Sequence, residues 1–335
     1  MNKKITVFAV ILIVIGIIGT ISSAVNAVPF ATNYVNEIIK KANEEVKIYE
    51  KKVDINKLDI ETKNLNVEIR KSDSDKLIIK QVGNLSTNSF TIDENNKEFN
   101  IKSNNENKYL DSKIQGFGDA ILNMINNSYN KIIVFVPNHV DIKVRTSVGD
   151  LIVENKDVLL NKIEFNTSQG QIILPKESKN LENLKISSMG TINLKVSELL
   201  GIKNIDISTQ DSVYIESTPD DIFVDNIESF IPESINIITS SRDFDTIDIK
   251  SNIPIAKNLN IDNKSGNVYL DLPVDRYNIH FDLNSLKGIH FDNENQDVES
   301  DKLINKFEGS FRDQKENELK YNVYVNSDNI NVYKK

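Results

Sequence analysis

Two of the three histidines in the chain stand in nearly identical surroundings that could hold a metal ion. His280 is followed two residues later by Asp282, and His290 by Asp292, in the same apolar–polar alternation. If the two segments stacked as adjacent strands, two imidazoles and two carboxylates could bind a divalent cation. The alternative, which we favour, is a pair of similar strands whose polar residues face solvent, because no further ligand can be identified. We therefore expect no metal site and no cofactor.

A second candidate for metal binding is the acidic run of residues 292–301. Oxygen-bearing side chains occur at alternate positions, as in calcium loops, but the run has neither the central Gly nor the Glu at the twelfth position of such a loop. A solvated acidic loop is therefore the better interpretation.

No other residue pattern specifies catalysis. Nothing in the chain resembles a nucleophile elbow, a phosphate-binding loop or a zinc-protease helix, and the absence of Cys removes any thiolate nucleophile. Trp is also absent, although sugar-cleaving enzymes commonly hold their substrates against aromatic rings. We predict a non-catalytic protein. The alternative is a carbohydrate-active enzyme on a β-helix scaffold, which clustered carboxylates on one face would favour over ladders of Asn, Ser and Lys.

The elements that must position any site are short alternating strands joined by a recurring turn. Apolar and polar residues alternate on both sides of each turn, which is the pattern of a strand with one buried face. The turn contains Gly at positions 149, 170 and 190 and Asp at position 211, at spacings of 21, 20 and 21 residues. A fixed period of this length is typical of stacked repeats. The sequence therefore predicts an all-β protein, a β-solenoid of strand-turn-strand repeats.

We assign structural roles, rather than chemical ones, to the turn residues Gly149, Asp150, Gly170, Gly190 and Gly266. Gly adopts a positive φ at little cost, so we expect Gly149, Gly170 and Gly190 each to have one. The strands that follow two of these turns should bury equivalent apolar positions, namely Ile172, Leu174, Ile192 and Leu194.

The charge balance excludes one class of partner. Lys and Arg total 40 against 49 Asp and Glu, a net charge of −9, and only five residues are Arg. Proteins that bind nucleic-acid phosphates usually present a basic face. We therefore expect no nucleic-acid partner.

The N-terminal region predicts a membrane segment. Residues 5–21 form an almost unbroken apolar run behind Lys3 and Lys4, about long enough to cross a bilayer as a helix. One interpretation is an uncleaved signal anchor over residues 1–28, and the other is a signal peptide cut after Ala27. Both place the main domain outside the cytoplasm. The first, which we favour, predicts a single-pass protein of the cell membrane with its N-terminus in the cytoplasm.

A helical stalk is expected after this segment, over residues 29–54. Six apolar or aromatic residues within residues 33–52 fall on one side of a helix: Val35, Ile38, Ile39, Ala42, Val46 and Tyr49. The β-solenoid domain would then occupy residues 55–335.

The repeats at residues 140–215, together with the apolar strand at residues 133–137, resemble the putative adhesin family of bacterial cell-envelope proteins. That family is of unknown function and is marked by successive Thr-Ser-Ser-Gly-Asp turns. The resemblance implies a β-solenoid-like fold at the cell surface, often behind one transmembrane segment, and for some relatives a link to envelope stress. It implies no catalytic residues. We therefore expect a membrane-anchored binding or scaffold protein whose further partner is a cell-wall polymer or an envelope protein.

Overall fold

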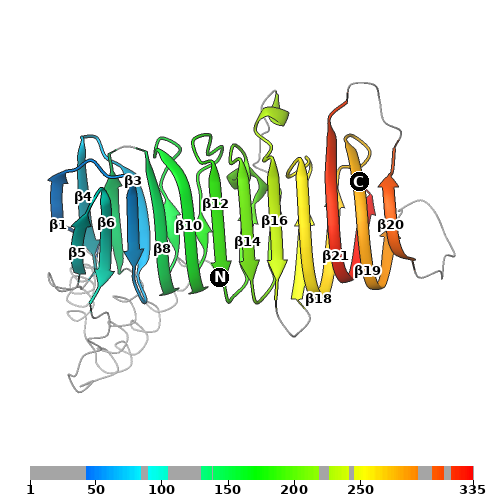
Figure 1. The fold of residues 1–335 in the computed structure, drawn as a ribbon, viewed down its shortest axis with the longest axis horizontal. Coiled ribbons are helices and arrows are strands. Elements are labelled where there is room, and N and C mark those ends of the chain that lie inside the picture. The colour runs from blue at the N-terminus through cyan, green and yellow to red at the C-terminus, as the bar shows by residue number, and fades with distance from the viewer. Residues whose placement is uncertain are drawn as a thin grey trace, which may run out of the picture.

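Twenty-one strands dominate the computed structural model, which describes residues 43–83, 90–104, 130–137, 139–218, 226–240, 245–292, 304–312 and 318–334. The strands stack side by side along one long axis (Figure 1). Each full coil has a strand on one face, a corner, and a strand on the opposite face. This arrangement confirms the all-β fold and the stacked repeats predicted from the sequence.

The first face is formed mainly by parallel strands, and we call its outward surface the ladder face. In spatial order its strands are β2 (Lys57–Glu61), β8 (Val140–Val148), β10 (Leu160–Gln169), β12 (Asn183–Ser188), β14 (Asn204–Thr209), β16 (Ser234–Thr239) and the first halves of β18 (Asn258–Leu272), β21 (Lys320–Lys334) and β19 (Asn278–Asp292).

The opposite face carries the second strand of each coil. Its strands are β3 (Asn66–Lys71), β9 (Leu151–Val153), β11 (Ile172–Ile173), β13 (Ile192–Lys195), β15 (Val213–Glu216), β17 (Asp245–Lys250) and the second halves of β18, β21 and β19. Two short helical segments, α4 (Val196–Leu199) and η1 (Ile227–Ser229), lie in connections between coils.

The core lies between the two faces. Because side chains alternate along each strand, every second residue points inward and meets its equivalent in the next coil. Four such positions predicted from the sequence are buried, at 3–4% exposure: Ile172, Leu174, Ile192 and Leu194.

Both ends of the array depart from sequence order. At the C-terminal end, the last strand β21 lies between β18 and β19, although it follows both in the chain. Strand β20 (Ile304–Ser310) then pairs antiparallel with β19. At the N-terminal end the strands beyond the first coil are β1 (Glu45–Lys52), β4 (Lys76–Val82), β5 (Phe90–Asn95), β6 (Glu98–Ser103) and β7 (Lys131–Val136).

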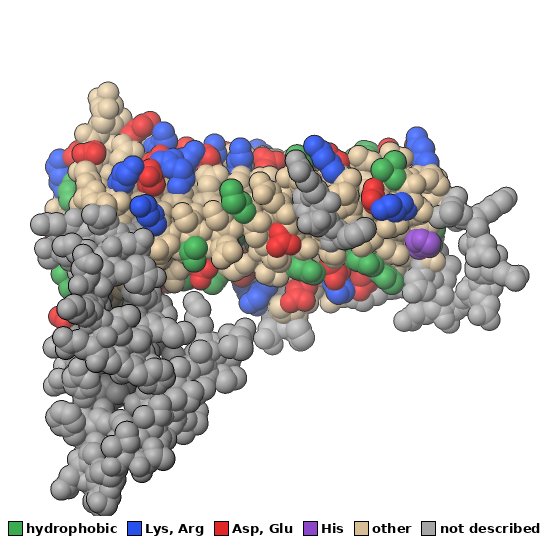
Figure 2. Space-filling model, turned by 90° about the horizontal axis from the view of Figure 1, so that it is seen from below, with side chains coloured by type: hydrophobic (Ala, Val, Ile, Leu, Met, Phe, Trp, Pro, Cys, Tyr) green, Lys and Arg blue, Asp and Glu red, His purple; other side chains and the backbone are tan. Residues whose placement is uncertain are grey.

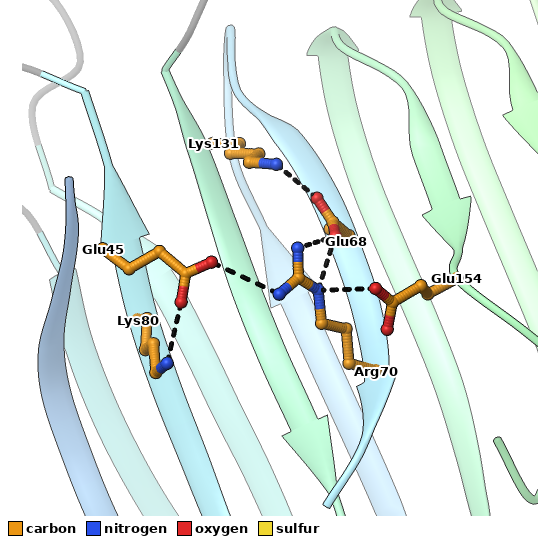
Figure 3. Close-up of polar contacts among 6 residues, drawn as sticks. All are labelled: Glu45, Glu68, Arg70, Lys80, Lys131 and Glu154. Carbon is orange, nitrogen blue, oxygen red and sulfur yellow. Dashed lines mark hydrogen bonds and ion pairs between the residues drawn. The ribbon is translucent and has the colours of Figure 1, made fainter. Parts of the chain in front are cut away.

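A cluster of charged side chains joins the N-terminal strands on the face opposite the ladder face. It consists of Glu45, Glu68, Arg70, Lys80, Lys131 and Glu154 (Figure 3). Glu68 is only 6% exposed, and its two carboxylate oxygens lie 2.6 Å from Arg70 Nε and 2.5 Å from Lys131 Nζ. Removing one partner of such a pair is costly because it leaves a buried charge uncompensated. The cluster therefore links strands that are distant in sequence, and loss of either partner of Glu68 would weaken the contacts among them.

The helical stalk predicted over residues 29–54 is wrong for residues 45–52, because these form strand β1. Strand β1 pairs antiparallel with β4, and two of its carboxylates bind lysines of β4. Glu50 lies 2.7 Å from Lys76, and Glu45 lies 2.7 Å from Lys80. These cross-strand contacts override a weak helical periodicity. The rest of the predicted helix lies outside the described residues.

The predicted location at the cell membrane is contradicted, because the described structure contains no suitable membrane-spanning helix. Within the described ranges, no helix is long and apolar enough to cross a bilayer. The apolar run of residues 5–21, on which the prediction depended, lies outside those ranges. The predicted helical anchor therefore has no counterpart in the described structure.

The placement of β21 between β18 and β19 can be tested with cysteine pairs, since the chain has no native Cys. Asn322 Nδ2 lies 3.0 Å from Asn258 Oδ1, and Asn322 also pairs in register with His280. We expect Asn258→Cys with Asn322→Cys to form a disulfide on oxidation. Asn258→Cys with His280→Cys should not, because the two positions are two strands, or ~9.6 Å, apart. Measurement is by gel mobility and peptide mapping, and crosslinking of the second pair alone would contradict this strand order.

Candidate functional site

The corner residues singled out in the sequence form a structural unit. At the corners a polar residue replaces the inward apolar residue, and several of these side chains bind backbone groups at the bend. Thr146 Oγ1 donates to the Lys63 carbonyl at 3.2 Å, and Thr209 Oγ1 donates to the Gly190 carbonyl at 2.8 Å. The buried members of this row are Thr62, Thr146, Thr167, Ser188, Thr209, Thr239, Asn263, Ser285 and Ser327.

Three of the four turn glycines are required for a reason other than the one expected. Gly149, Gly170 and Gly190 do not have positive φ, nor does Gly266. A Cβ at Gly170 would instead lie 2.0 Å from the Gly149 carbonyl oxygen of the neighbouring coil. The corresponding distances at Gly149 and Gly266 are 2.2 and 2.0 Å, to the carbonyl oxygens of the adjacent coil. Glycine is thus needed because the stacked backbones approach too closely for a side chain.

Asp150 lies in a relay of side chains that crosses from coil to coil. Its backbone N–H donates to Asn66 Oδ1 at 2.9 Å, and its own Oδ1 accepts from the Gln171 N–H at 2.9 Å. Gln171 Oε1 in turn accepts from the Asn193 N–H at 3.1 Å. This use of the carboxylate is consistent with a structural role for Asp150.

The histidine pair cannot form the metal site considered above. His280 and His290 lie on the same strand, β19, which bends around a corner between them. His280 is in register with Asn322 of the ladder face, whereas His290 is in register with Asn331 of the opposite face. In the part of the chain that the structure describes, no three His, Asp or Glu residues are grouped for metal binding. Most of the acidic run at residues 292–301 lies outside it.

The ladder face carries the arrangement that sequence reasoning did not identify. Equivalent outward residues of successive coils stack in rows, and amide side chains bind along them. Asn260 Nδ2 donates to Asn236 Oδ1, and Asn236 Nδ2 donates to Asp206 Oδ1, both at 2.8 Å. In the adjacent row Asn284 Nδ2 donates to Asn326 Oδ1 at 3.3 Å. Asn204 Nδ2 donates to Asn183 Oδ1 at 3.2 Å, and the two residues are 21 positions apart in the sequence. Aligning the repeats by their period could have revealed this stacking of asparagines.

A shallow groove of about 710 Å³ runs along the corner side of this face, from β2 to the end of β16. Its lining is mostly hydroxyl and amide side chains, with charged residues only toward the N-terminal end. The outward residues that line it are Glu61, Lys63, Arg145, Ser147, Asn166, Ser168, Ser187, Met189, Ser208, Gln210 and Ser240. The coil ends, seen from below in Figure 2, likewise show mostly uncharged polar side chains and backbone.

The groups that carry charge at the N-terminal end of the ladder face are paired with each other. Arg145 lies 2.8 Å from Asp59, and Lys143 lies 2.7 Å from Glu164. The hydrogen bond from Lys143, together with one from Asn166, lowers the pKa of Glu164 despite partial burial. Lys102 and Arg145 lower the pKa of Glu61 in the same way. The carboxylates of Glu164 and Glu61 are therefore held ionised and neutralised, which suits binding better than acid catalysis.

A second, smaller depression of about 420 Å³ continues along the same face over β16, β18, β21 and β19. Two exposed apolar side chains line it, Ile238 and Tyr324, at 47% and 41% exposure. Asparagines and two aspartates surround them. The ladder face thus offers one long polar path with an aromatic ring at its C-terminal end.

Comparison with known proteins identifies a family. The family described as Toastrack DUF4097 matches residues 55–333, which confirms the resemblance inferred from the repeats. A solved structure described as a putative adhesin from Bacteroides fragilis NCTC 9343 is 10% identical, with a TM-score of 0.40, over 88% of this chain and 98% of that chain. Another, described as a putative cell adhesion protein from Clostridium sporogenes ATCC 15579, is 12% identical, with a TM-score of 0.23, over 87% and 100%. No curated protein matches.

The steric role of the turn glycines can be tested by comparing two of them. Gly170→Ala should lower the free energy of unfolding by about 2–4 kcal/mol, because the new Cβ would collide with the Gly149 carbonyl oxygen. Gly190→Ala should cost less than about 1 kcal/mol, because its Cβ would lie 3.3 Å from the nearest atom, the Ser168 oxygen. Urea denaturation measures both. Equal losses would contradict the close-approach explanation.

The Lys143–Glu164 pair should contribute a pH-dependent stability. Because the folded-state pKa of Glu164 is lowered, its contribution is present above the unfolded-state pKa and is lost as pH falls through the folded-state value. Between pH 7 and pH 3 the free energy of unfolding of Lys143→Gln should therefore fall by about 0.5–1 kcal/mol less than that of the wild type. Lys185→Gln, in the same row on β12, is the matched control. If both variants follow the wild-type pH profile, Glu164 is not held by Lys143.

Proposed function

The chain belongs to the Toastrack DUF4097 family, and we propose that it is a non-catalytic binding protein whose ladder face holds an extended, hydroxyl-rich polymer. The observation that carries this proposal is the continuity of the groove, which crosses six strands and is lined by stacked hydroxyl and amide groups. Since neighbouring strands are ~4.8 Å apart, the groove repeats the same hydrogen-bonding groups along about 24 Å. A polymer of similar polar units matches such a surface better than a compact ligand.

A polysaccharide fits this surface better than a charged polymer. The centre of the groove is formed by neutral side chains, such as Asn166, Ser187 and Ser208, and its charged groups are paired nearby. Met189, at 60% exposure, adds an apolar contact between the hydroxyls. Of the two further partners expected from the sequence, a polymer is favoured over a protein because the groove is long and polar and has little apolar area to anchor a protein interface.

The alternative of a carbohydrate-active enzyme is less well supported by the acids that the structure describes on the ladder face. Glycoside hydrolysis usually requires two carboxyl groups on opposite sides of the bond to be cleaved. Asp282 lines the smaller depression, but Glu308, its neighbour in register on β20, does not. Asp206 and Asp262 both accept hydrogen bonds from asparagines. The arrangement therefore favours ladders for binding over clustered carboxylates for catalysis.

Binding in the groove can be followed through Met189, which is one of three methionines in the chain and the one that lines the groove. With methyl-13C methionine and soluble dextran, β-glucan and glycol chitin as probes, we expect at least one polymer to shift the Met189 signal. The same polymer should slow oxidation of Met189 by peroxide, since a covered thioether is less accessible. No release of reducing ends should accompany binding.

Two arginine substitutions on the same coil, one in the groove and one on the opposite face, provide the test and its control. Ser187→Arg places a long charged side chain in the groove and should weaken binding about 10-fold or more, a loss equivalent to about 1.4 kcal/mol. Asn193→Arg adds the same side chain on the opposite face and should change affinity by less than about two-fold. Equal effects of the two substitutions, or no Met189 shift with any probe, would contradict binding in the groove. Release of reducing ends would instead support the enzyme.

A further inference from the structure

The smaller depression on the ladder face surrounds an exposed tyrosine with hydrogen-bond acceptors. The register places Tyr324 of β21 directly between Asn260 of β18 and Asp282 of β19. In the next row of the same strands, Asn326 lies between Asp262 and Asn284. Rows on one face are two residues apart along each strand, about 6.8 Å. The ring of Tyr324 is therefore bordered on both sides by short polar side chains.

The hydrogen bonds along the two rows leave three acceptors unused around this ring. Asn260 donates to Asn236, and Asn284 donates to Asn326, so that their own Oδ1 atoms lie at the free ends of the two amide chains. Asp282 has no hydrogen-bond or ion-pair partner among the residues that the structure describes. By contrast, Asp262 accepts from Asn326 at 3.1 Å. The groups close to Tyr324 thus include three acceptors that a ligand can use.

A ligand for this depression must present an apolar face and several hydrogen-bond donors at its rim. The apolar face would cover the ring of Tyr324, which is 41% exposed, whereas Ile238 lies two strands away in the next row. Proteins commonly bind small ligands against aromatic rings and orient them with a few fixed polar groups. A pyranose ring has this composition, because its C–H groups form one face and its hydroxyls lie around the edge.

We propose that the depression binds one pyranose unit of a neutral glycan, stacked on Tyr324, with hydroxyls donating to Asn260, Asp282 and Asn284. The proposal rests on the function proposed above and names its ligand class and the position of one sugar subsite. The subsite lies at the C-terminal end of the polar path. A glycan held in the hydroxyl groove would thereby gain a fixed position at one end.

Tyrosine-ring 13C labelling of the full-length chain tests this subsite, with cellohexaose, maltohexaose and chitohexaose as probes. Tyr324→Phe identifies the Tyr324 signal by its loss. We expect at least one hexasaccharide to shift that signal, because stacking changes the surroundings of the ring, while the Tyr214 signal stays in place. Tyr214 is the matched control, because it is 38% exposed on the opposite face.

Affinity measurements on variants complete the test. Tyr324→Ala should weaken binding of that hexasaccharide about 10-fold, whereas Tyr324→Phe, which keeps the ring, and Tyr214→Ala should remain within about three-fold of the wild type. Equal affinities of Tyr324→Ala and Tyr214→Ala would overturn the proposal. So would a Tyr324 signal that responds to tetramethylammonium and to none of the sugars, because the depression would then bind cations through the ring and the acidic groups.

The Met189 signal separates failure of this subsite from failure of the groove. A hexasaccharide that shifts Met189 but not Tyr324 would overturn the subsite and leave the groove proposal standing. One that shifts Tyr324 alone would support the subsite while contradicting a continuous path. Absence of both shifts with all three sugars would overturn both proposals.

Discussion

The close approach of stacked backbones at the corners is the constraint on which the rest of this structure depends. Neighbouring coils lie one strand spacing apart, ~4.8 Å, and at the corner a carbonyl oxygen of one coil occupies the space that a Cβ of the next would need. Glycine relieves that conflict at positions 149, 170 and 266. The adjacent inward hydroxyls, such as those of Thr146 and Thr209, bind carbonyl groups at the bend, so the turn can be tight without leaving those groups unsatisfied.

Once the corners fix the register, the properties of both the interior and the surface follow. Equivalent residues of successive coils must stack, so apolar residues form continuous rows inside and polar residues form continuous rows outside. Inside, these rows make one core along the whole array. Outside, they make the amide ladders and the hydroxyl groove. The surface proposed to bind a ligand is therefore a direct consequence of the repeat, which explains why its chemistry is itself repetitive.

The sequence predicted the elements that depend on local pattern and failed where distant strands decide. The turn spacing was enough to predict stacked coils and the burial of Ile172 and Leu194. It could not show that residues 45–52 pair with β4 and form a strand, because the stabilising contacts come from lysines some 30 residues away. Nor could it show that β19 bends between His280 and His290 and separates them onto opposite faces.

The candidate site was missed because its residues look unremarkable one at a time. Asn, Ser and Thr are common throughout this chain, and only the stacking of the coils turns them into rows. The depression around Tyr324 was even harder to predict, since β21 enters between β18 and β19 out of sequence order. No local motif indicates that Tyr324 will lie between Asn260 and Asp282.

The central claim, that an extended polymer lies along the groove, is tested most directly by the dependence of affinity on ligand length. Isothermal titration with a series of glycan oligomers of one linkage would provide it. The account predicts that affinity rises with each added unit until the oligomer spans about 24 Å, the length of six strands at ~4.8 Å spacing, and then levels off. An affinity already at its maximum for a disaccharide would contradict an extended site.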